Sequence, residues 1–148
     1  RRDPMAMLPF IGYHVGDYIN HWIEIGKAAN ATKLPRIFYV NWFRKDDEGS
    51  FVWPGFRENI RVLKWAIDRI EGTATATETA IGRVPTPESL DVEGLALSAQ
   101  ELEVALAVKA DEWQNEIGQI EEWFAKIGDK LPTSMRDELD ALRHRLDG

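Results

Sequence analysis

Residues 38–59 concentrate aromatic side chains on both sides of a short acidic turn and end in a polar triplet. Rings at this density constrain the fold, because they need either a shared core or a ligand to cover their faces. A Pro-Gly pair at residues 54–55 turns the chain just before the last ring. The region therefore favours either a hairpin core or a slot for a flat base, where each stacked base gains roughly 1–3 kcal/mol. Its aromatic residues are Phe38, Tyr39, Trp42, Phe43, Phe51, Trp53 and Phe56.

The pattern of apolar residues predicts an α+β fold, with short antiparallel strands, flanking helices and a helical C-terminal third. Arg36–Phe43 has strand character, and Phe51–Trp53 is expected to pair back on it across a turn at Asp46–Ser50. Residues 73–79 are either extended or a loop, and residues 80–85 are expected to form a short strand. Helices are predicted over residues 15–29, 58–71 and 98–108, from Trp113 to Gly128, and from about Ser134 onward.

Local signals support these helices. Gly72 stands where a left-handed C-terminal cap belongs, and Ser98 with Glu101 forms a capping box. Each helix also carries an apolar stripe. The stripes are Val15, Ile19, Trp22, Ile23 and Gly26; Ile60, Leu63, Ile67 and Ile70; Trp113, Ile117, Ile120, Phe124 and Ile127; and Met135, Leu139 and Leu142.

Composition excludes several classes of protein. The net charge of −7 is concentrated in residues 96–148, which carry 6 basic and 12 acidic side chains, against 12 and 13 in residues 1–95. An acidic C-terminal part repels phosphate backbones, so a nucleic-acid-binding role is not expected. The absence of cysteine excludes disulfides and thiolate zinc sites and fits a cytoplasmic protein. No apolar run reaches the roughly 18–20 residues of a membrane span.

The beginning of the chain suggests that it belongs to something longer. It starts with Arg1-Arg2-Asp3-Pro4, without an initiator methionine or a signal peptide. We therefore expect a fragment or the trimmed part of a longer protein.

A base-binding slot would need more than stacking, because every base has a π-face. Guanine carries an acceptor at O6 and donors at N1 and N2, so selecting it requires matching polar groups in a desolvated site. The walls of such a slot would be Phe43, Phe51 and Phe56, and its edge readers would be Asn59 and nearby backbone groups. Residue types alone leave the hairpin core open as the alternative.

Two segments, residues 38–46 and 51–59, resemble the guanine-binding region of GTP-dependent phosphoenolpyruvate carboxykinase. The opening Arg2–Phe10, with Gly12 and Tyr13, resembles the segment that follows this enzyme's mobile lid. The resemblance is close over about residues 1–95 and continues to the C-terminus, so it covers the whole chain but only the last part of the enzyme. It implies the C-terminal part of a larger nucleotide-binding domain. Residues 1–95 would carry the guanine pocket, and residues 96–148 would be a C-terminal helical segment of the same domain.

The same resemblance implies the site. In the family, the rings that match Phe43, Phe51 and Phe56 enclose the guanine, and the residue that matches Asn59 contacts it. Arg57 and Glu58 lie inside this nucleotide-binding motif, with the Arg57 side chain expected to face solvent. Asp3–Tyr13 would anchor the hinge of the lid. No catalytic residue is expected within the chain.

The implied reaction converts oxaloacetate and GTP to phosphoenolpyruvate, GDP and carbon dioxide, a step of gluconeogenesis. GTP or GDP would bind as substrate. The phosphate loop, the ligands of Mn²⁺ (with Mg²⁺ on the nucleotide) and the arginines that bind oxaloacetate would all precede this chain. The parent protein is expected to be a monomer, and the fragment alone is expected to be inactive.

Other polar and aromatic side chains are expected to have ordinary structural roles. Arg44 and Lys45 could touch phosphate, but next to acidic residues 46–48 they are expected to cap a solvated turn.

His14 and His21 are two helical turns apart, yet no third metal ligand is convincingly placed. The acidic run with Glu116, Glu121, Glu122 and Asp129 reads as a solvated face. Trp113, Trp123 and Phe124 read as core or as a docking surface for another part of the parent protein.

Two rival functions remain open at this stage. The first is a non-catalytic α+β module that uses exposed rings to bind a protein partner. The second is an aromatic carbohydrate-binding surface, which the six tryptophans would suit. Their spacing on amphipathic helices favours burial over carbohydrate binding.

Overall fold

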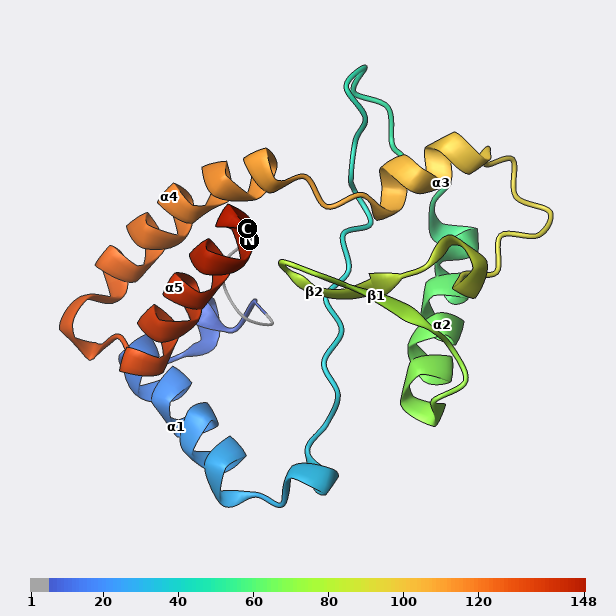
Figure 1. Cartoon of the computed structure of the whole chain (residues 1–148). Helices are drawn as coiled ribbons and strands as arrows, with labels where there is room; N and C mark the ends of the chain where they lie inside the picture. Colours follow the sequence, from blue (N-terminus) through green and yellow to red (C-terminus); the bar gives the residue numbers. More distant parts are fainter. Residues whose placement is uncertain (1–5) are drawn as a thin grey trace. The chain divides into compact units, whose positions relative to one another are not determined.

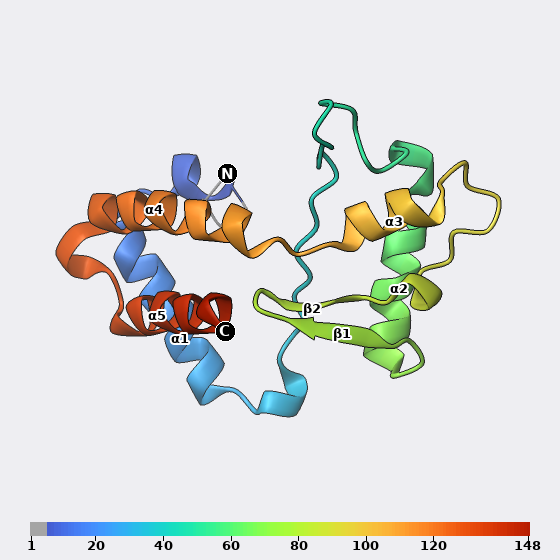
Figure 2. The ribbon, with the colours of Figure 1, turned by 45° about the horizontal axis from the view of Figure 1, so that its top comes forward.

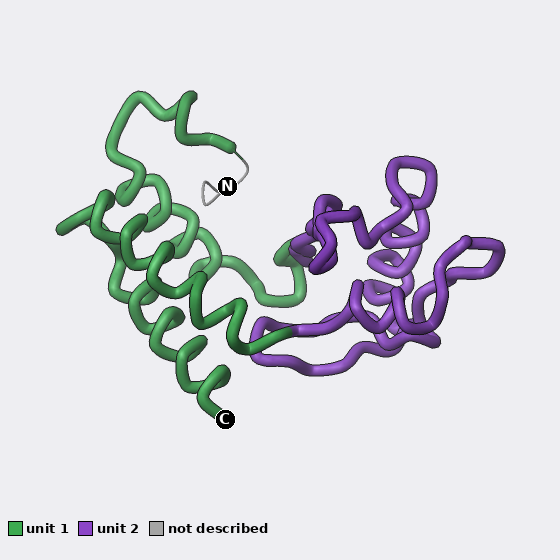
Figure 3. Tube along the Cα trace, turned by 90° about the horizontal axis from the view of Figure 1, so that it is seen from above, with its two compact units in different colours: residues 1–35, 109–148 green, residues 36–108 purple. Residues whose placement is uncertain are grey.

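The computed structural model describes residues 6–148, which form two compact units (Figure 3). Unit 1 joins the described residues up to Pro35 to Lys109–Gly148, and unit 2 is Arg36–Val108. Of the expected hinge segment Asp3–Tyr13, and of the opening Arg2–Phe10 motif, the part before Ala6 lies outside the described residues. The two units have other bounds than the predicted segments 1–95 and 96–148. The assignment of those segments to parts of one domain stays a prediction.

Unit 1 is helical in its described part. Its elements are α1 (Val15–Ala28), α4 (Ala110–Ile127) and α5 (Thr133–Asp147), with short 3-10 turns at Leu8–Phe10, Ala31–Lys33 and Gly128–Lys130. Helices α4 and α5 lie side by side (Figures 1 and 2). Gly128, with φ of +66°, ends α4 in a conformation that favours glycine and lets the chain reverse into α5.

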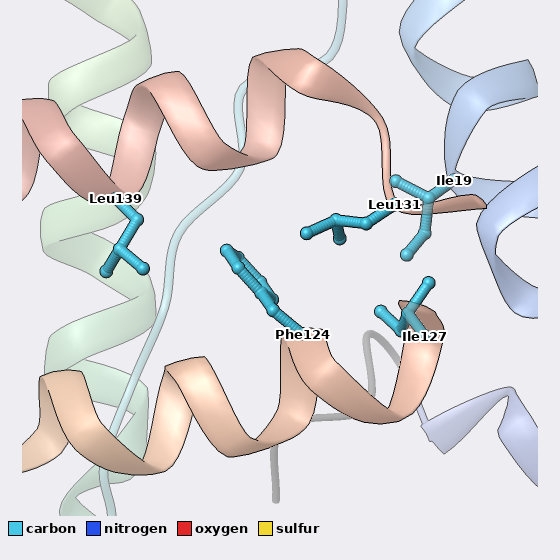
Figure 4. Close-up of a cluster of buried hydrophobic side chains, with 5 residues drawn as sticks. All are labelled: Ile19, Phe124, Ile127, Leu131 and Leu139. Atoms are coloured by element: carbon cyan, nitrogen blue, oxygen red, sulfur yellow. The ribbon is translucent and has the colours of Figure 1, made fainter. Parts of the chain in front are cut away.

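The core of unit 1 forms where the apolar stripes of these helices meet. Phe124 projects from α4 into the space between α4 and α5, where Leu139 also lies, and Ile127 gathers with Ile19 of α1 and Leu131 at the other end of the cluster (Figure 4). Of the predicted stripes, Ile117, Ile120, Phe124 and Ile127 of α4 and Met135 and Leu139 of α5 are therefore confirmed as packing residues. Burial of such side chains is the main term that holds helices of this length in place.

Helix α1 approaches the chain after α4 so closely that its second residue has to be glycine. A Cβ on Gly16 would lie 2.4 Å from the carbonyl oxygen of Lys130. The Lys130 ammonium group also pairs with the Asp17 carboxylate at 2.6 Å. At the same end His14 accepts a hydrogen bond from the Gly16 amide through Nδ1 at 3.0 Å and so caps the helix.

Unit 2 contains both strands of the described chain. Its elements are α2 (Asn59–Glu71), β1 (Ala76–Thr79), β2 (Gly82–Pro85) and α3 (Ala99–Leu106), with 3-10 turns at Phe56–Glu58 and Pro87–Ser89. The strands pair antiparallel in a hairpin with Thr79 opposite Gly82 (Figure 1). A cluster of buried side chains, Trp53, Trp65, Leu90 and Leu102, forms the core of this unit.

Most predicted helices are confirmed, and the α+β class with them. Gly72 adopts the left-handed cap with φ of +79°. The capping box of α3 is present: the Ser98 amide donates to the Glu101 carboxylate at 2.7 Å, and the Glu101 amide donates to the Ser98 hydroxyl at 3.2 Å. Helix α3 ends two residues before its predicted end, and the N-terminus of α4 lies before Trp113.

The predicted strand at Arg36–Phe43 is wrong. Residues 36–41 belong to no helix or strand, and Trp42 and Phe43 lie in a turn. No part of the described chain pairs with this stretch, and Ile37 and Tyr39 are 87% and 88% exposed. The β propensity of its residues is therefore not enough to form a strand without a partner. The expected pairing with Phe51–Trp53 is reduced to one antiparallel bridge, between Lys45 and Phe51. The expected short strand at residues 80–85 is confirmed as β2, and residues 76–79 are the extended alternative rather than a loop.

The predicted apolar stripe of α2 does not face the core of unit 2. Ile60, Leu63, Ile67 and Ile70 are 64%, 50%, 55% and 53% exposed. The helix instead buries Trp65 on its opposite face, against Leu90 and Leu102. We call the four exposed residues the open face of α2.

No helix within residues 6–148 is long and apolar enough to cross a membrane.

We predict that Gly16→Ala lowers the free energy of unfolding by about 1–3 kcal/mol, because the new methyl group overlaps a backbone carbonyl that cannot turn away. Urea denaturation of the 148-residue chain measures this. Gly26→Ala is the matched control in the same helix, where nothing lies within 4 Å of the added Cβ. It should gain about 0.5–1 kcal/mol from helix propensity. Equal stability of the two variants would contradict the close approach.

Candidate functional site

The predicted site residues lie on one loop of unit 2, residues 41–59, which we call the aromatic loop. An acidic turn sets its shape. The Asp46 amide donates to the Ser50 carbonyl at 3.0 Å, and the Asp46 carboxylate accepts from the Ser50 amide at 2.8 Å. Gly49 takes the positive φ, +84°, that closes the turn. The expected turn at Asp46–Ser50 is confirmed.

This turn brings the first two predicted ring walls together. The Lys45–Phe51 bridge and a hydrogen bond from the Val52 amide to the Arg44 carbonyl (3.0 Å) align the two sides of the loop. The ring centroids of Phe43 and Phe51 then lie 6.2 Å apart at 62°, an edge-to-face contact. Both rings remain largely in solvent, at 74% and 58% exposed.

Phe56, the third predicted wall, stands on the other side of the Pro-Gly turn. Gly55 has φ of +111°, a backbone conformation that residues with a Cβ rarely adopt. Phe56 follows directly as the first residue of the 3-10 turn before α2. The Phe56 ring is 93% exposed. All three predicted walls are thus exposed and available to a ligand. A ligand that covered them would gain the free energy of burying their apolar surface.

Asn59, the predicted edge reader, is the first residue of α2 and is half-buried. Its side-chain oxygen Oδ1 accepts a hydrogen bond from the indole Nε1 of Trp53 at 3.0 Å. Trp53 itself is 9% exposed and belongs to the core of unit 2. The amide of Asn59 is thus tied directly to the core.

Glu58 and Arg57 differ in their surroundings although they are neighbours. The Glu58 carboxylate pairs with Arg61 at 2.7 Å, and this hydrogen bond raises the pKa of Arg61 above its ordinary value. Arg61 also donates to the carbonyl oxygens of Asp91 and Glu93 at 3.0 and 2.9 Å. Glu58 therefore helps to fasten α2 to the segment after β2. The Arg57 side chain is exposed, as expected.

The expectation that Arg44 merely caps a solvated turn is wrong. Its guanidinium group donates to the carbonyl oxygens of Ala105 and Ala107, at 3.2 and 2.7 Å, where α3 ends. The last carbonyls of a helix lack internal partners, so a cation is favoured there. Lys45 lies with its ammonium group 5.1 Å from the centroid of the Phe51 ring, in a cation–π contact. Arg44 anchors the loop, and Lys45 covers one of its rings.

Other candidates from the sequence have structural roles. His14 caps α1, and no group of three potential metal ligands gathers among residues 6–148. Glu121 and Glu122 are exposed, and Glu121 pairs with Arg143. Phe124 is confirmed as core, and Trp123 packs half-buried against it.

A hollow of about 270 Å³ lies in unit 1, away from the predicted residues. It is open to the surface and almost wholly apolar. Its lining comes from the faces of α1, α4 and α5, chiefly Ile19, Ile120, Trp123, Phe124, Met135 and Leu139. Without convergent polar groups it offers no basis for orienting a substrate.

Sequence reasoning gave no function to Trp53 and misjudged Arg44. One signal was available for Trp53: a buried tryptophan usually finds a partner for its N–H, and an asparagine stands six residues later. The partners of Arg44 lie more than 60 residues away in the sequence, and no local pattern reveals them.

In chemical terms, the aromatic loop presents exposed ring faces and leads into an amide whose oxygen is bonded to Trp53. Such an arrangement can bind and orient a planar group.

Comparison with known proteins identifies the family. Residues 1–145 match the family model described as the phosphoenolpyruvate carboxykinase C-terminal P-loop domain. The chain is 58% identical over 146 residues to the phosphoenolpyruvate carboxykinase (GTP) of Paenarthrobacter aurescens strain TC1. It is 49% identical over 146 residues to that of Corynebacterium kroppenstedtii and 50% identical over 149 residues to that of Treponema pallidum strain Nichols.

These alignments cover 99–100% of the chain but only 23–24% of each relative. The chain thus spans about a quarter of the length of the curated relatives that it matches. Because the match extends through both units and the whole aromatic loop, the chain belongs to the GTP-dependent phosphoenolpyruvate carboxykinase family.

Proposed function

We propose that this chain supplies the guanine-binding pocket of a GTP-dependent phosphoenolpyruvate carboxykinase. The observation that carries the proposal is the exposure of Phe43, Phe51 and Phe56 on one loop that leads into Asn59, whose amide is bonded to Trp53. Three uncovered phenyl rings within 14 residues are costly to a folded protein unless a ligand covers them. A purine provides two apolar faces for the rings and a polar edge for the amide.

For the whole protein we propose the reaction of oxaloacetate with GTP to give phosphoenolpyruvate, GDP and carbon dioxide. In this scheme the aromatic loop holds the purine so that the triphosphate reaches the reacting groups elsewhere, and it contributes through binding and orientation. A divalent metal, bound by residues outside this chain, would supply Lewis acidity and neutralise phosphate charge. Arg57 and Glu58 belong to the proposed nucleotide-binding motif, Glu58 through its ion pair with Arg61.

Further features of the parent protein follow from the same proposal. Oxaloacetate and phosphoenolpyruvate would bind outside this chain, whose sequence contains no Walker-type phosphate loop. The chain alone would be inactive. The absence of cysteine supports a cytoplasmic location, and we propose that the parent is a monomer.

We predict that the carboxykinase-length polypeptide binds GDP far more tightly than ADP, as measured by isothermal titration calorimetry. Phe56→Ala should weaken GDP binding by about 5- to 150-fold, because one stacking face is lost. Asn59→Ala should weaken GDP more than ADP, since it removes an edge contact.

Ile37→Ala is the matched control, because Ile37 is also a highly exposed apolar side chain, at 87%, but lies outside the aromatic loop. It should leave GDP binding unchanged. Equal binding of GDP and ADP by the wild type, unaffected by Phe56→Ala, would favour the protein-interaction module instead.

We predict carbon dioxide release from oxaloacetate that requires GTP and manganese, again with the carboxykinase-length polypeptide. ATP in place of GTP should give little activity. Phe56→Ala should raise KM for GTP more than it lowers kcat, because the ring contributes binding distant from the reacting bond. A folded protein that is inactive with both nucleotides would overturn the proposed reaction.

The open face of α2 supports the proposal that a longer chain covers this part of the molecule. Its four aliphatic side chains are each at least half exposed, while the chain spans about a quarter of the length of its relatives. We propose that the remaining three-quarters of a carboxykinase chain packs on this face. Burial of a leucine or isoleucine side chain gains about 1.5–3 kcal/mol, which makes such a stripe a strong docking element.

We predict that the 148-residue chain alone binds the dye ANS and that the carboxykinase-length polypeptide binds much less. Ile67→Glu should reduce dye binding by the short chain without lowering its Tm. In the long polypeptide the same substitution should lower Tm by several degrees, because a carboxylate would be buried without a partner. A long polypeptide that tolerates Ile67→Glu would show that the open face stays in solvent.

A further inference from the structure

We propose that Trp53 is a positioning residue that determines base specificity, by holding the Asn59 amide in the orientation that reads guanine. This inference rests on the proposed guanine-binding function and deepens it. Trp53 would not touch the nucleotide. It would act through the hydrogen bond from its indole Nε1 to Asn59 Oδ1, which is 3.0 Å long.

The chemistry of the two groups sets the direction of the amide. An indole N–H can only donate, whereas the asparagine amide has an accepting oxygen at one end and a donating NH₂ at the other. The amide atom facing Trp53 must therefore be the oxygen. The NH₂ group of Asn59 is left to point away from Trp53, free to serve a ligand.

The tryptophan is held firmly enough to impose this choice. Its ring is 9% exposed and belongs to the buried cluster with Trp65, Leu90 and Leu102. If Asn59 turned its amide over, NH₂ would face N–H, and a core donor would lose its partner.

A fixed NH₂ group distinguishes the two purines at position 6. Guanine carries the acceptor O6 there, whereas adenine carries an amino group, which is a donor. A donor on the protein pairs with the first and opposes the second. A freely turning amide could pair with either base. By fixing the amide, the hydrogen bond from Trp53 would make Asn59 selective for guanine over adenine.

The test compares dissociation constants for GDP and ADP in the carboxykinase-length polypeptide with Trp53→Phe, which keeps an aromatic ring and removes the N–H. We expect the preference for GDP over ADP to fall by roughly tenfold or more. IDP carries the same O6 as guanine, so its binding should weaken by the same factor as that of GDP.

Trp65→Phe is the matched control. It also removes a buried indole N–H from the same cluster, one bonded to the Ser89 hydroxyl at 3.0 Å. Trp65→Phe should lower Tm and leave the GDP-to-ADP ratio unchanged. A role of Trp53 in packing alone would produce this same pattern, so a lowered Tm with an unchanged ratio in Trp53→Phe would overturn the inference.

A second variant covers the case in which Trp53→Phe does not fold. Asn59→Asp keeps an oxygen for Trp53 and removes the NH₂ group. It should fold like the wild type and lose the preference for GDP, while any repulsion of phosphate weakens both nucleotides alike. A preserved GDP preference in Asn59→Asp would contradict the proposed donor.

Failure of the proposed function gives a different result. In that case the wild type shows no preference for GDP and Phe56→Ala changes nothing. If the wild type prefers GDP and Phe56→Ala loses binding, a Trp53→Phe variant that keeps the wild-type ratio rejects the role of Trp53 alone. An Asn59→Asp variant that also keeps this ratio rejects the Asn59 donor as well.

Discussion

Two buried tryptophans organise unit 2, and the geometry of the aromatic loop depends on them. Trp53 and Trp65 contribute the largest side chains of its core, and each donates its indole N–H to a polar partner, Asn59 and Ser89 respectively. Buried donors of this kind are stable only when paired. Each pairing fixes a neighbouring segment: the start of α2 in one case and the turn after β2 in the other. The core and the proposed site therefore share side chains.

Buried and solvent-exposed side chains alternate along the aromatic loop. Val52 and Trp53 are 9% exposed, while Phe51 and Phe56 on either side are more than half exposed. The turn at Asp46–Ser50 and the positive φ at Gly55 produce this alternation. Arg44 adds a tether to the end of α3. The loop is held by backbone turns and core contacts, so a ligand of the proposed site would not need to order it.

We propose that this chain contributes recognition of the nucleotide to a carboxykinase. The described residues provide stacking faces and one oriented amide, and the reaction chemistry is proposed to lie elsewhere in a carboxykinase chain. The open face of α2 fits this division of labour, because an aliphatic stripe left in water needs a partner surface. Unit 1 has its own packed core around Phe124 and Ile127, built from the meeting of three helices.

Local sequence determined much of this protein. Periodicity predicted the five helices, and residue type predicted the Gly72 cap, the Ser98–Glu101 capping box and the turn at Asp46–Ser50, since each depends on neighbours within a few positions. It also indicated which rings and which asparagine to examine. Tertiary structure decided the rest. It left Arg36–Phe43 without a strand partner, turned the α2 stripe outward, carried Arg44 to carbonyls over 60 residues away and set the direction of the Asn59 amide. The physical reason is that pairing and burial depend on which distant surfaces meet, and local propensity carries no information about those partners.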